Sequence, residues 1–571
     1  MRRTHTTSFV LRRVPQNRTA RVVVVLLLLP FSFLLSPFSE ASAQRRTPRR
    51  ATTATTATRT GEAQVASLNA EARASLDAAM KALEAGATAE AERAARAAVA
   101  AAPRSPVTHN VLGVALDSLG RADEALAAFN TAIRLDPEFV SAHNNLGRLL
   151  AGQGKTAEAI SEFERVLKID ATHQQAHYNL GALYAGASNF TKAADHFARA
   201  RADAPDDPQL ALAFLNVAYR AGRTAEAEAA TAIVERAVAR DARGLWTLAT
   251  ALAQNNQYER AARLFAEVNR LQPHTFEVLY NLGIALYNLK RNDEATKALA
   301  EAADINPAPA ETHFRLGLIA SAGNDHANAV EEFKHAVERE PARAEYHYML
   351  GREYFRVGYW DGAIENYGRA MSLDSKQSAY VFNRGNANYR KGEWAAAAAD
   401  FEAAAALDPK IANIEYLLGY TNRAAGNFDR ARQYLERVVA KEPNHVDALA
   451  SLGYVAIEQG RLDEAEAPLK RALELAPASV EVMYDYARLA IKRRDYTEAV
   501  ARLERAVQRD PTHAQAQYQL FLAYSRLKQN ERAQAALAEF KRLDAIDKKV
   551  RDERRFDERL RTQQMLGQSS P

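Results

Sequence analysis

Residues 152–156 read Gly-Gln-Gly-Lys-Thr and are the best candidates in the chain for binding phosphate. Glycine amides followed by lysine and threonine form the end of a phosphate-binding loop, where the amides cradle the phosphates. The full motif has another glycine five residues before Gly154, but that residue is Leu149. The motif must also follow a β-strand, whereas Gly154 falls at a recurrent turn between two expected helices. We therefore predict no nucleotide site here.

A second kind of chemistry, metal binding, is suggested by five histidines that occupy the same place in a repeated pattern. Copies in successive repeats would lie at least a helix-packing distance apart, roughly 8–10 Å. Zinc–nitrogen bonds are about 2.0–2.1 Å, so these side chains cannot share one ion. We predict recurrent helix-face residues, with no metal site and no cofactor. The five are His109, His143, His177, His313 and His347.

Catalytic groups of other kinds are not evident in the sequence. The chain has no cysteine, which excludes disulfides, thiolate nucleophiles and cysteine-ligated zinc. It has no His-Glu-x-x-His motif and no calcium-binding loop. The carboxylates of Asp206 and Asp207 lie between Pro205 and Pro208, where turn formation explains them. We therefore predict that the protein is not an enzyme.

The charge of the 571-residue chain is concentrated at its ends. Lysine and arginine number 75 against 70 acidic residues, but basic residues at both termini leave 72–547 with a net charge of about −6. Binding of nucleic acid depends on clustered lysine and arginine that displace counterions from phosphate. The slightly acidic body therefore argues against nucleic acid as a partner.

The amino terminus has the features of a targeting segment. Arginines within 1–21 precede an apolar run at 22–38, and Ala41-Ser42-Ala43 follows. This order is typical of a secretory signal peptide, which we predict over 1–43. The alternative is an inner-membrane anchor formed by 22–38. We expect the protein in the periplasm or cell envelope, with membrane contact only through this segment if it is uncleaved. Residues 44–71 are rich in Thr, Ala and Arg, which predicts a flexible linker.

The rest of the chain has a 34-residue period. Leu-Gly pairs at 112–113, 146–147 and 180–181 follow this period, which tiles 72–547 with 14 repeats, numbered here from residue 72. Alanine is at position 20 of all 14 repeats, proline at position 32 of ten and glycine at position 15 of eight. A fixed period of this kind indicates a repeat architecture. Position 24 is aromatic at Phe129, Phe163, Phe197, Phe265, Phe333, Tyr367 and Phe401.

Each preferred residue has a mechanical reason. Two helices of about 13 residues fit in one repeat, with a turn near position 15 where glycine supplies a left-handed conformation. Small residues at positions 8 and 20 let the two helices cross closely, and the aromatic ring at position 24 fills the space beside the crossing. Proline at position 32 cannot continue the second helix.

In these residues the chain resembles the tetratricopeptide repeat (TPR) family over 72–547. The resemblance implies an all-α, right-handed superhelical solenoid of about 14 helix-turn-helix units, with the first helices lining its concave side. Repeats 208–241 and 514–547 depart most, with Leu215 and Phe521 where glycine is expected. Residues 548–571 contain Val550, Phe556 and Leu560 among many charges. We predict that this tail is a polar helix capping the last repeat.

The resemblance also implies that repeat positions 2, 5, 9 and 12 face the concave groove. Aromatic side chains suit protein contacts because they bury a large area at low entropic cost, but here they could instead pack on their neighbours. The glutamates at position 2 indicate a solvated face or a cationic ligand. The candidates are Tyr178, Trp246, Tyr280, Phe314, Tyr348, Phe382, Tyr416, Tyr484 and Tyr518 at position 5; Asn145, Asn179, Asn281 and Asn383 at position 6; and Glu277, Glu311 and Glu345 at position 2.

Because one repeat type fills nearly all of the chain beyond its leader, we predict a non-enzymatic scaffold that binds proteins or peptides in the groove. Two alternatives remain open. The protein could be a component of polysaccharide export or outer-membrane assembly machinery, or it could bind carbohydrate through its aromatic row.

Overall fold

The structure is a computed structural model that describes residues 64–565, with side chains as far as residue 553. The predicted signal peptide (1–43), linker residues 44–63 and residues 566–571 lie outside this range. The described residues form helices and turns and contain no strand. Contacts divide them into two units, 64–298 and 299–565, and each unit is described by itself.

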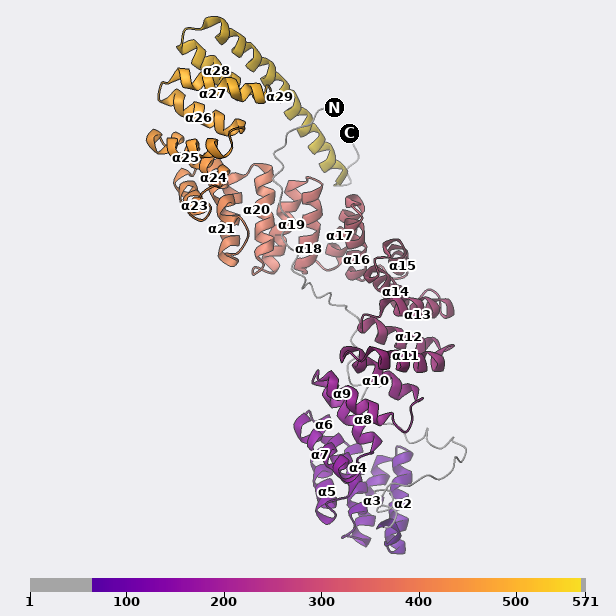
Figure 1. Cartoon of the computed structure of the whole chain (residues 1–571). Coiled ribbons are helices and arrows are strands. Elements are labelled where there is room, and N and C mark those ends of the chain that lie inside the picture. Colours follow the sequence, from indigo (N-terminus) through magenta and orange to yellow (C-terminus); the bar gives the residue numbers. More distant parts are fainter. Residues whose placement is uncertain (1–63, 566–571) are drawn as a thin grey trace. The chain divides into compact units, whose positions relative to one another are not determined.

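Two helices form every repeat, as the 34-residue period predicts (Figure 1). Most first helices begin at position 1 of their repeat, and every second helix begins at position 17. The first helices are α2 (Ala70–Glu84), α4 (Pro106–Ser118), α6 (Val140–Gly152), α8 (Gln174–Gly186), α10 (Pro208–Arg220), α12 (Ala242–Gln254), α14 (Phe276–Asn288), α16 (Ala310–Ala322), α18 (Ala344–Arg356), α20 (Ser378–Lys391), α22 (Ile414–Ala424), α24 (Val446–Glu458), α26 (Val480–Lys492) and α28 (Ala514–Arg526). The second helices are α3 (Thr88–Ala101), α5 (Ala122–Leu135), α7 (Thr156–Ile169), α9 (Phe190–Ala200), α11 (Thr224–Val238), α13 (Tyr258–Leu271), α15 (Asn292–Ile305), α17 (His326–Arg339), α19 (Trp360–Leu373), α21 (Trp394–Leu407), α23 (Phe428–Lys441), α25 (Leu462–Leu475), α27 (Tyr496–Arg509) and α29 (Asn530–Met565).

The turn inside each repeat is left-handed at position 15, which confirms the prediction from glycine. All 14 residues at this position have positive φ, from 58° at Ser188 to 89° at Gly392. Backbone bonds then close the first helix, as where Lys155 N–H donates to the carbonyl of Leu150 at 2.9 Å. Six repeats adopt this conformation without glycine, although a side chain disfavours it. These six residues are Ser188, Asn256, Lys290, Asn324, Arg494 and Lys528.

Close packing of the two helices depends on the pair at positions 8 and 24. A Cβ atom added to Gly147 would lie 2.8 Å from the ring of Phe163; in five other repeats a ring covers this glycine in the same way, and Gly419 and Gly453 are covered by leucines. The ring therefore lies directly over the glycine, closer than the expected place beside the crossing. Repeat 5 exchanges the two sizes: Leu215 replaces the glycine and Thr231 replaces the ring, and both are fully buried.

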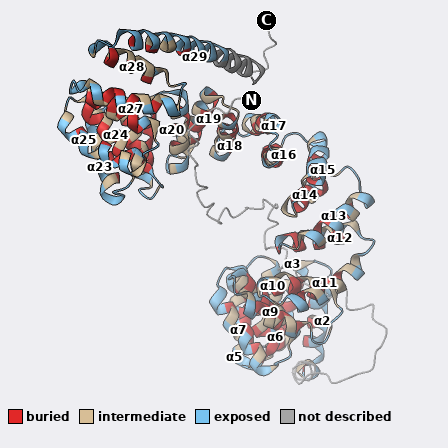
Figure 2. Cartoon of the chain, turned by 45° about the horizontal axis from the view of Figure 1, so that its top comes forward, coloured by how far each residue is buried: buried red, intermediate tan, exposed pale blue. Residues whose placement is uncertain are grey.

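Within each unit, consecutive repeats stack because a second helix, such as α13 or α19, also packs against the first helix of the next repeat. In the second unit, the first helices α22, α24 and α26 also contact one another in order. Figure 2 shows that buried residues of α24 and α27 face neighbouring helices, while the exposed residues follow the outer surfaces. Nearest-neighbour packing of this kind makes each unit a solenoid.

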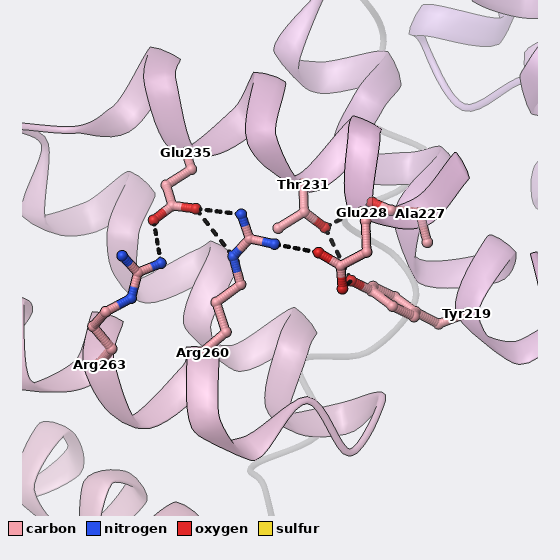
Figure 3. Close-up of polar contacts among 7 residues, drawn as sticks. All are labelled: Tyr219, Ala227, Glu228, Thr231, Glu235, Arg260 and Arg263. Carbon is pink, nitrogen blue, oxygen red and sulfur yellow. Dashed lines mark hydrogen bonds and ion pairs between the residues drawn. The ribbon is translucent and has the colours of Figure 1, made fainter. Parts of the chain in front are cut away.

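Polar side chains tie second helices of neighbouring repeats together in the first unit (Figure 3). Arg260 of α13 forms ion pairs with Glu228 and Glu235 of α11, the latter at 2.8 Å, and Arg263 binds Glu235 at 2.6 Å. The Tyr219 hydroxyl donates to Glu228 at 2.6 Å. Burial, together with this bond to a carboxylate, raises the pKa of Tyr219 to about 12.

Both ends of the array differ from the predicted boundaries. Leu68 is buried, Val65 packs on the same core, and Asn69 caps α2 by accepting from Ala72 N–H at 2.7 Å. The linker prediction is therefore wrong for residues 64–71, because their apolar side chains join the first repeat. At the other end α29 runs unbroken from Asn530 to Met565, so the tail is not a separate helix. Neither glycine nor proline interrupts this stretch, and residues 544–553 are all exposed.

Candidate interaction surface

The histidines at position 4 form hydrogen bonds that connect neighbouring helices. Nδ1 of His143 lies 2.6 Å from Glu162 of the second helix, and its Nε2 donates to the Pro137 carbonyl at 3.0 Å. His347 makes the equivalent contacts with Asn366 and the Pro341 carbonyl. Each ring thus joins both helices of its repeat to the end of the preceding repeat. Within the described residues no cluster of three His, Cys, Asp or Glu could hold a metal.

Repeat 4 pairs two histidines at this place. Nδ1 of His177 lies 3.0 Å from Nδ1 of His196, while Nε2 of His177 contacts the Ala171 carbonyl at 3.0 Å. Because that carbonyl needs a donor, the His177 Nδ1 accepts, and a second proton would set two N–H groups against each other. Burial and the neighbouring His177 lower the pKa of His196 to about 4, and burial also lowers the pKa of His177.

The glycine-rich segment at 152–156 has the geometry of an ordinary turn. Gly154 is the left-handed residue between α6 and α7, with φ of 74°. Its carbonyl accepts from Thr156 N–H at 2.9 Å, and a helix precedes it in place of the strand that a phosphate loop requires.

The predicted position-5 aromatic residues are half-buried or buried. Tyr178 meets Phe197 with ring centroids 5.4 Å apart, and four further position-5 rings pack on the position-24 ring of their own repeat. Phe314 and Tyr416 are only 4% and 6% exposed. Stacking on neighbours is thus a principal role of this row. The remaining rings contact other aromatic or histidine rings: Tyr280 with Phe276, Tyr416 with His445, Tyr484 with His513, and Tyr518 with Phe540.

The predicted asparagines make local hydrogen bonds. Asn145 donates to the Asn110 side chain of the preceding repeat at 3.0 Å, and Asn281 donates to the Glu277 carbonyl at 2.8 Å. Asn383 donates to the Tyr348 hydroxyl at 3.3 Å. Asn179 accepts from Gln175 at 3.2 Å, and its own amide nitrogen is buried without a partner in the described structure.

The three predicted glutamates have different surroundings. Glu311 binds Arg315 at 2.6 Å and accepts from the Tyr346 hydroxyl at 2.9 Å, which leaves 14% of its side chain exposed. Glu277 and Glu345 are exposed. Because Glu311 is already neutralised within the repeat, these residues do not form one uniform anionic row.

A row that sequence analysis did not single out lies on the first helices of repeats 10–13. We call Tyr389, Tyr420, Arg423, Tyr454 and Arg488 the Arg–Tyr row. The Tyr389 and Tyr420 centroids are 5.9 Å apart. The guanidinium of Arg423 lies 4.7 Å from the Tyr420 centroid and 4.8 Å from that of Tyr454. The guanidinium of Arg488 lies 4.7 Å from the centroid of Tyr454, so Tyr454 contacts both arginines. All five side chains are half-buried.

The two arginines of this row differ electrostatically. Arg488 pairs with Asp485 at 3.2 Å and also with Glu458. Burial raises the pKa of Asp485, and Arg488 and Arg423 oppose that rise. Arg423, in contrast, makes two cation–π contacts, and no hydrogen bond or ion pair of its guanidinium occurs in the described structure. Cations over aromatic faces are stabilised by the ring quadrupole, which holds Arg423 in place without neutralising it.

The row joins position 12 of one repeat to position 9 of the next. This pairing links Tyr389 to Tyr420 and Arg423 to Tyr454, both separated by 31 residues. Positions 9 and 12 were expected on the groove side, but the aromatic residues at these positions were not among the predicted contact residues. A search for aromatic and arginine residues 31 apart would have found the row from sequence.

A cavity of about 450 Å³ lies elsewhere in the second unit, beside the start of α22. Its lining includes Ala405, Ile414, Tyr434 and Lys441. The helix begins two residues later than its counterparts, after Asn413 in a left-handed conformation with φ of 58°. Position 28 is alanine here, at Ala405, where several repeats have larger residues: Ile133, Leu167, Val337, Met371 and Leu473.

Comparisons with known proteins agree with the repeat pattern. Models described as tetratricopeptide repeat match residues 76–138, 110–174, 144–208, 247–310, 310–343, 348–410, 416–480 and 490–549. No curated protein matches the chain.

Several solved structures are similar to parts of the chain. Residues 41 to the end of MamA from Desulfovibrio magneticus RS-1 are 24% identical, covering 30% of this chain and 98% of that one, with a TM-score of 0.29. The C-terminal part of a TPR repeat-containing protein from Cytophaga hutchinsonii is 19% identical, with coverages of 48% and 99% and a TM-score of 0.31. The structure of Naa15/Naa10 bound to HypK-THB gives 15% identity, coverages of 88% and 98%, and a TM-score of 0.31. At these identities and TM-scores we draw no conclusion about partners from them.

Proposed function

Because the chain belongs to the tetratricopeptide repeat family, we propose that it is a non-catalytic scaffold that binds a protein or peptide partner on its first helices. The binding surface is centred on the Arg–Tyr row of repeats 10–13. The single observation that carries this proposal is the guanidinium of Arg423 held between Tyr420 and Tyr454.

The residue types in the row are those that dominate protein interfaces. Tyrosine and arginine are enriched among residues whose truncation costs most binding free energy. The rings of the row are fixed by contacts with one another, so their side chains would lose little conformational entropy when a partner binds. A half-buried, polar-edged surface of this kind suits a partner that is itself partly polar.

The location of the row within the array also supports one main binding region. In repeats 3 and 4 the same two positions carry Arg148 with Ala151, and Ala182 with Ala185. Small side chains there cannot form a continuous aromatic surface. Tyr219, Tyr287 and Phe355 also occupy position 12 in repeats 5, 7 and 9, but the linked contacts of the row occur in repeats 10–13.

The test is selection of peptides from a displayed library of random 12-residue sequences, using the purified full chain. We expect enriched peptides whose affinity falls at least tenfold in the double variant Tyr420→Ala/Tyr454→Ala. Tyr434→Ala is the matched control, because Tyr434 is a half-buried tyrosine on the second helix of repeat 11. Failure to select any peptide, or equal loss in the control, would contradict the proposal. A parallel glycan array examines carbohydrate as the ligand.

We further propose that the protein is exported to the cell envelope, on the basis of the targeting features of residues 1–43. No helix within residues 64–565 is long and apolar enough to span a membrane. Mass spectrometry of the mature amino terminus distinguishes cleavage after Ala43 from retention of 22–38. Recovery of the intact amino terminus in a soluble cytoplasmic fraction would contradict export.

A further inference from the structure

The Arg–Tyr row contains one cationic group with no anionic partner of its own. The Arg423 guanidinium lies over two tyrosine rings, 4.7 Å from the centroid of Tyr420 and 4.8 Å from that of Tyr454. Guanidinium N–H groups lie in the plane of the group and point outward from its edge. No hydrogen bond or ion pair uses these donors in the described structure, so they remain available in the fork that matches a carboxylate.

We propose that the partner of this surface is a peptide whose aspartate, glutamate or terminal carboxylate binds Arg423 in a bidentate ion pair. The inference rests on the proposed function, since it assumes that the first helices bind a peptide. It adds the chemistry of recognition, namely an acidic group held at one named residue between two tyrosine rings.

The four helices that carry the row, α20, α22, α24 and α26, hold six arginine or lysine residues against five aspartate or glutamate residues, and the basic excess lies on the side of α18. The first helices α18, α20 and α22 carry six arginine or lysine residues against three glutamates. Glu353 is occupied by Arg356 at 3.0 Å, and Glu415 is paired with Lys441. Two further arginines, Arg352 and Arg390, have no ion pair within the described residues. Each of these three consecutive first helices thus carries one arginine without an ion pair in the described structure, at repeat positions 9, 13 and 12.

The neighbouring Arg488 shows what Arg423 lacks. Asp485 and Glu458 already occupy the donors of Arg488, which contacts the same Tyr454 ring. The row thus contains Arg488, which is paired with carboxylates of the protein itself, and Arg423, whose donors are available to a ligand. Asp485 influences Arg423 only through its charge, and its hydrogen bonds go to Arg488.

Peptide is favoured over other anionic polymers by the flanking rings and by the spacing of the arginines. Neighbouring packed helices lie roughly 8–10 Å apart. An extended peptide advances about 3.3 Å per residue, so acidic side chains about three residues apart could reach arginines on successive first helices. The tyrosines between them supply apolar area for the intervening side chains.

The experiment uses an array of extended decapeptides with Glu scanned through each position, each matched to its Gln counterpart, and probed with the full chain. We expect binding of the best Glu peptides to exceed that of their Gln counterparts by about 10–100-fold, because hydrogen bonds between charged groups are the strong ones. Arg423→Ala should abolish this preference. Arg423→Gln, which keeps a polar side chain of similar length, should do the same without opening the row.

The matched control is Arg437→Ala. Arg437 stacks on Tyr434 at 5.5 Å on the second helix of the same repeat and has no ion pair in the described structure. We expect this variant to retain the preference for Glu. Circular dichroism and thermal unfolding of all variants verify that repeat 11 stays folded.

Each outcome decides the inference. Peptide binding without preference for Glu, or a preference that survives both Arg423 variants, overturns it while leaving the proposed function intact. Binding of polygalacturonate or a single-stranded oligonucleotide in place of peptides overturns it as well. Absence of all peptide binding overturns both proposals.

Discussion

At the scale of single residues, the repeat depends on where a Cβ atom is missing. Gly147 lies under the Phe163 ring at a distance that no Cβ could occupy without displacing the ring. The close approach requires glycine because of its size, and the helix itself would accept alanine. The exchange of sizes between Leu215 and Thr231 shows that one large and one small residue suffice.

We predict that Gly147→Ala destabilises the protein by about 1–3 kcal/mol, because the packed ring must move. Gly152 provides a control in the same helix, since a Cβ there would meet nothing within 4 Å. Gly152→Ala should be neutral or stabilise by up to about 1 kcal/mol. Urea unfolding of both variants checks this. Equal effects of the two substitutions would contradict the packing argument.

Histidines in the contact between repeat positions 4 and 23 should respond to pH in opposite directions, as His196 of repeat 4 and His143 of repeat 3 illustrate. His196 has a folded-state pKa of about 4, below the usual value near 6.5 in an unfolded chain. The stabilisation from the neutral His196 is therefore complete above about pH 6.5 and is lost as pH falls toward 4, with roughly 2 kcal/mol lost at pH 5. For His143, burial lowers the pKa but the Glu162 and Pro137 contacts outweigh it, so the pKa is raised. The stabilisation from protonated His143 is therefore lost as pH rises through its raised folded-state pKa.

The measurement is the urea midpoint of the wild type and His196→Glu between pH 7.5 and 5. We expect the variant to lose less stability on acidification than the wild type, because its glutamate would pair with His177 as Glu162 pairs with His143. An unchanged or steeper loss of stability would show that the histidine pair is not the acid-sensitive contact.

For single residues, the sequence predicted which repeat positions matter but not which side chains contact one another. A close crossing at the small residues of positions 8 and 20 was expected, but the ring at position 24 was expected only beside that crossing, whereas it covers the position-8 glycine itself. The contact of His177 with His196 was not expected, since position 23 varies among Glu162, His196 and Asn366. Likewise the rings at position 5 were candidates for binding, but whether such a ring faces solvent or a neighbour depends on side-chain packing.

At the scale of elements, the 34-residue period predicted the helix boundaries, because each turn contains its own termination signal. The left-handed residue at position 15 is present even where the side chain resists it, as at Arg494 with φ of 65°. The surrounding helices therefore impose the turn. The ends were predicted less well because a repeat pattern does not specify what precedes or follows it.

We predict that Arg494→Gly stabilises the protein by about 1 kcal/mol, because an L-residue in the left-handed region costs roughly 1–2 kcal/mol. Arg494 is exposed, and its side chain makes no hydrogen bond or ion pair within the described residues. Lys492→Gly, two residues earlier and inside α26, should instead destabilise by roughly 0.5–1 kcal/mol. Thermal unfolding compares the two, and stabilisation by Lys492→Gly would contradict the explanation.

At the scale of the whole molecule, stability is a sum over repeats and the interfaces between adjacent repeats. Contacts in each unit are made mainly between consecutive helices. A local defect should consequently remain local, unlike in a protein with one central core.

We predict that Gly147→Ala accelerates amide hydrogen exchange in α5–α8 by about tenfold or more, with little change in α18–α28. Exchange measured by mass spectrometry on peptides from the full chain checks this expectation. Uniform acceleration along the chain would show that the array unfolds as one cooperative body.

The constant register of the repeats has a consequence for how such a chain can change in length. His445 and Ser479 each stand immediately before a first helix and each cap it through a side chain that accepts a backbone N–H. Removing 446–479 would therefore splice equivalent joints together, as would duplicating the same stretch. The array can therefore be lengthened or shortened by whole repeats, and each remaining junction between repeats keeps the same kind of sequence and contacts.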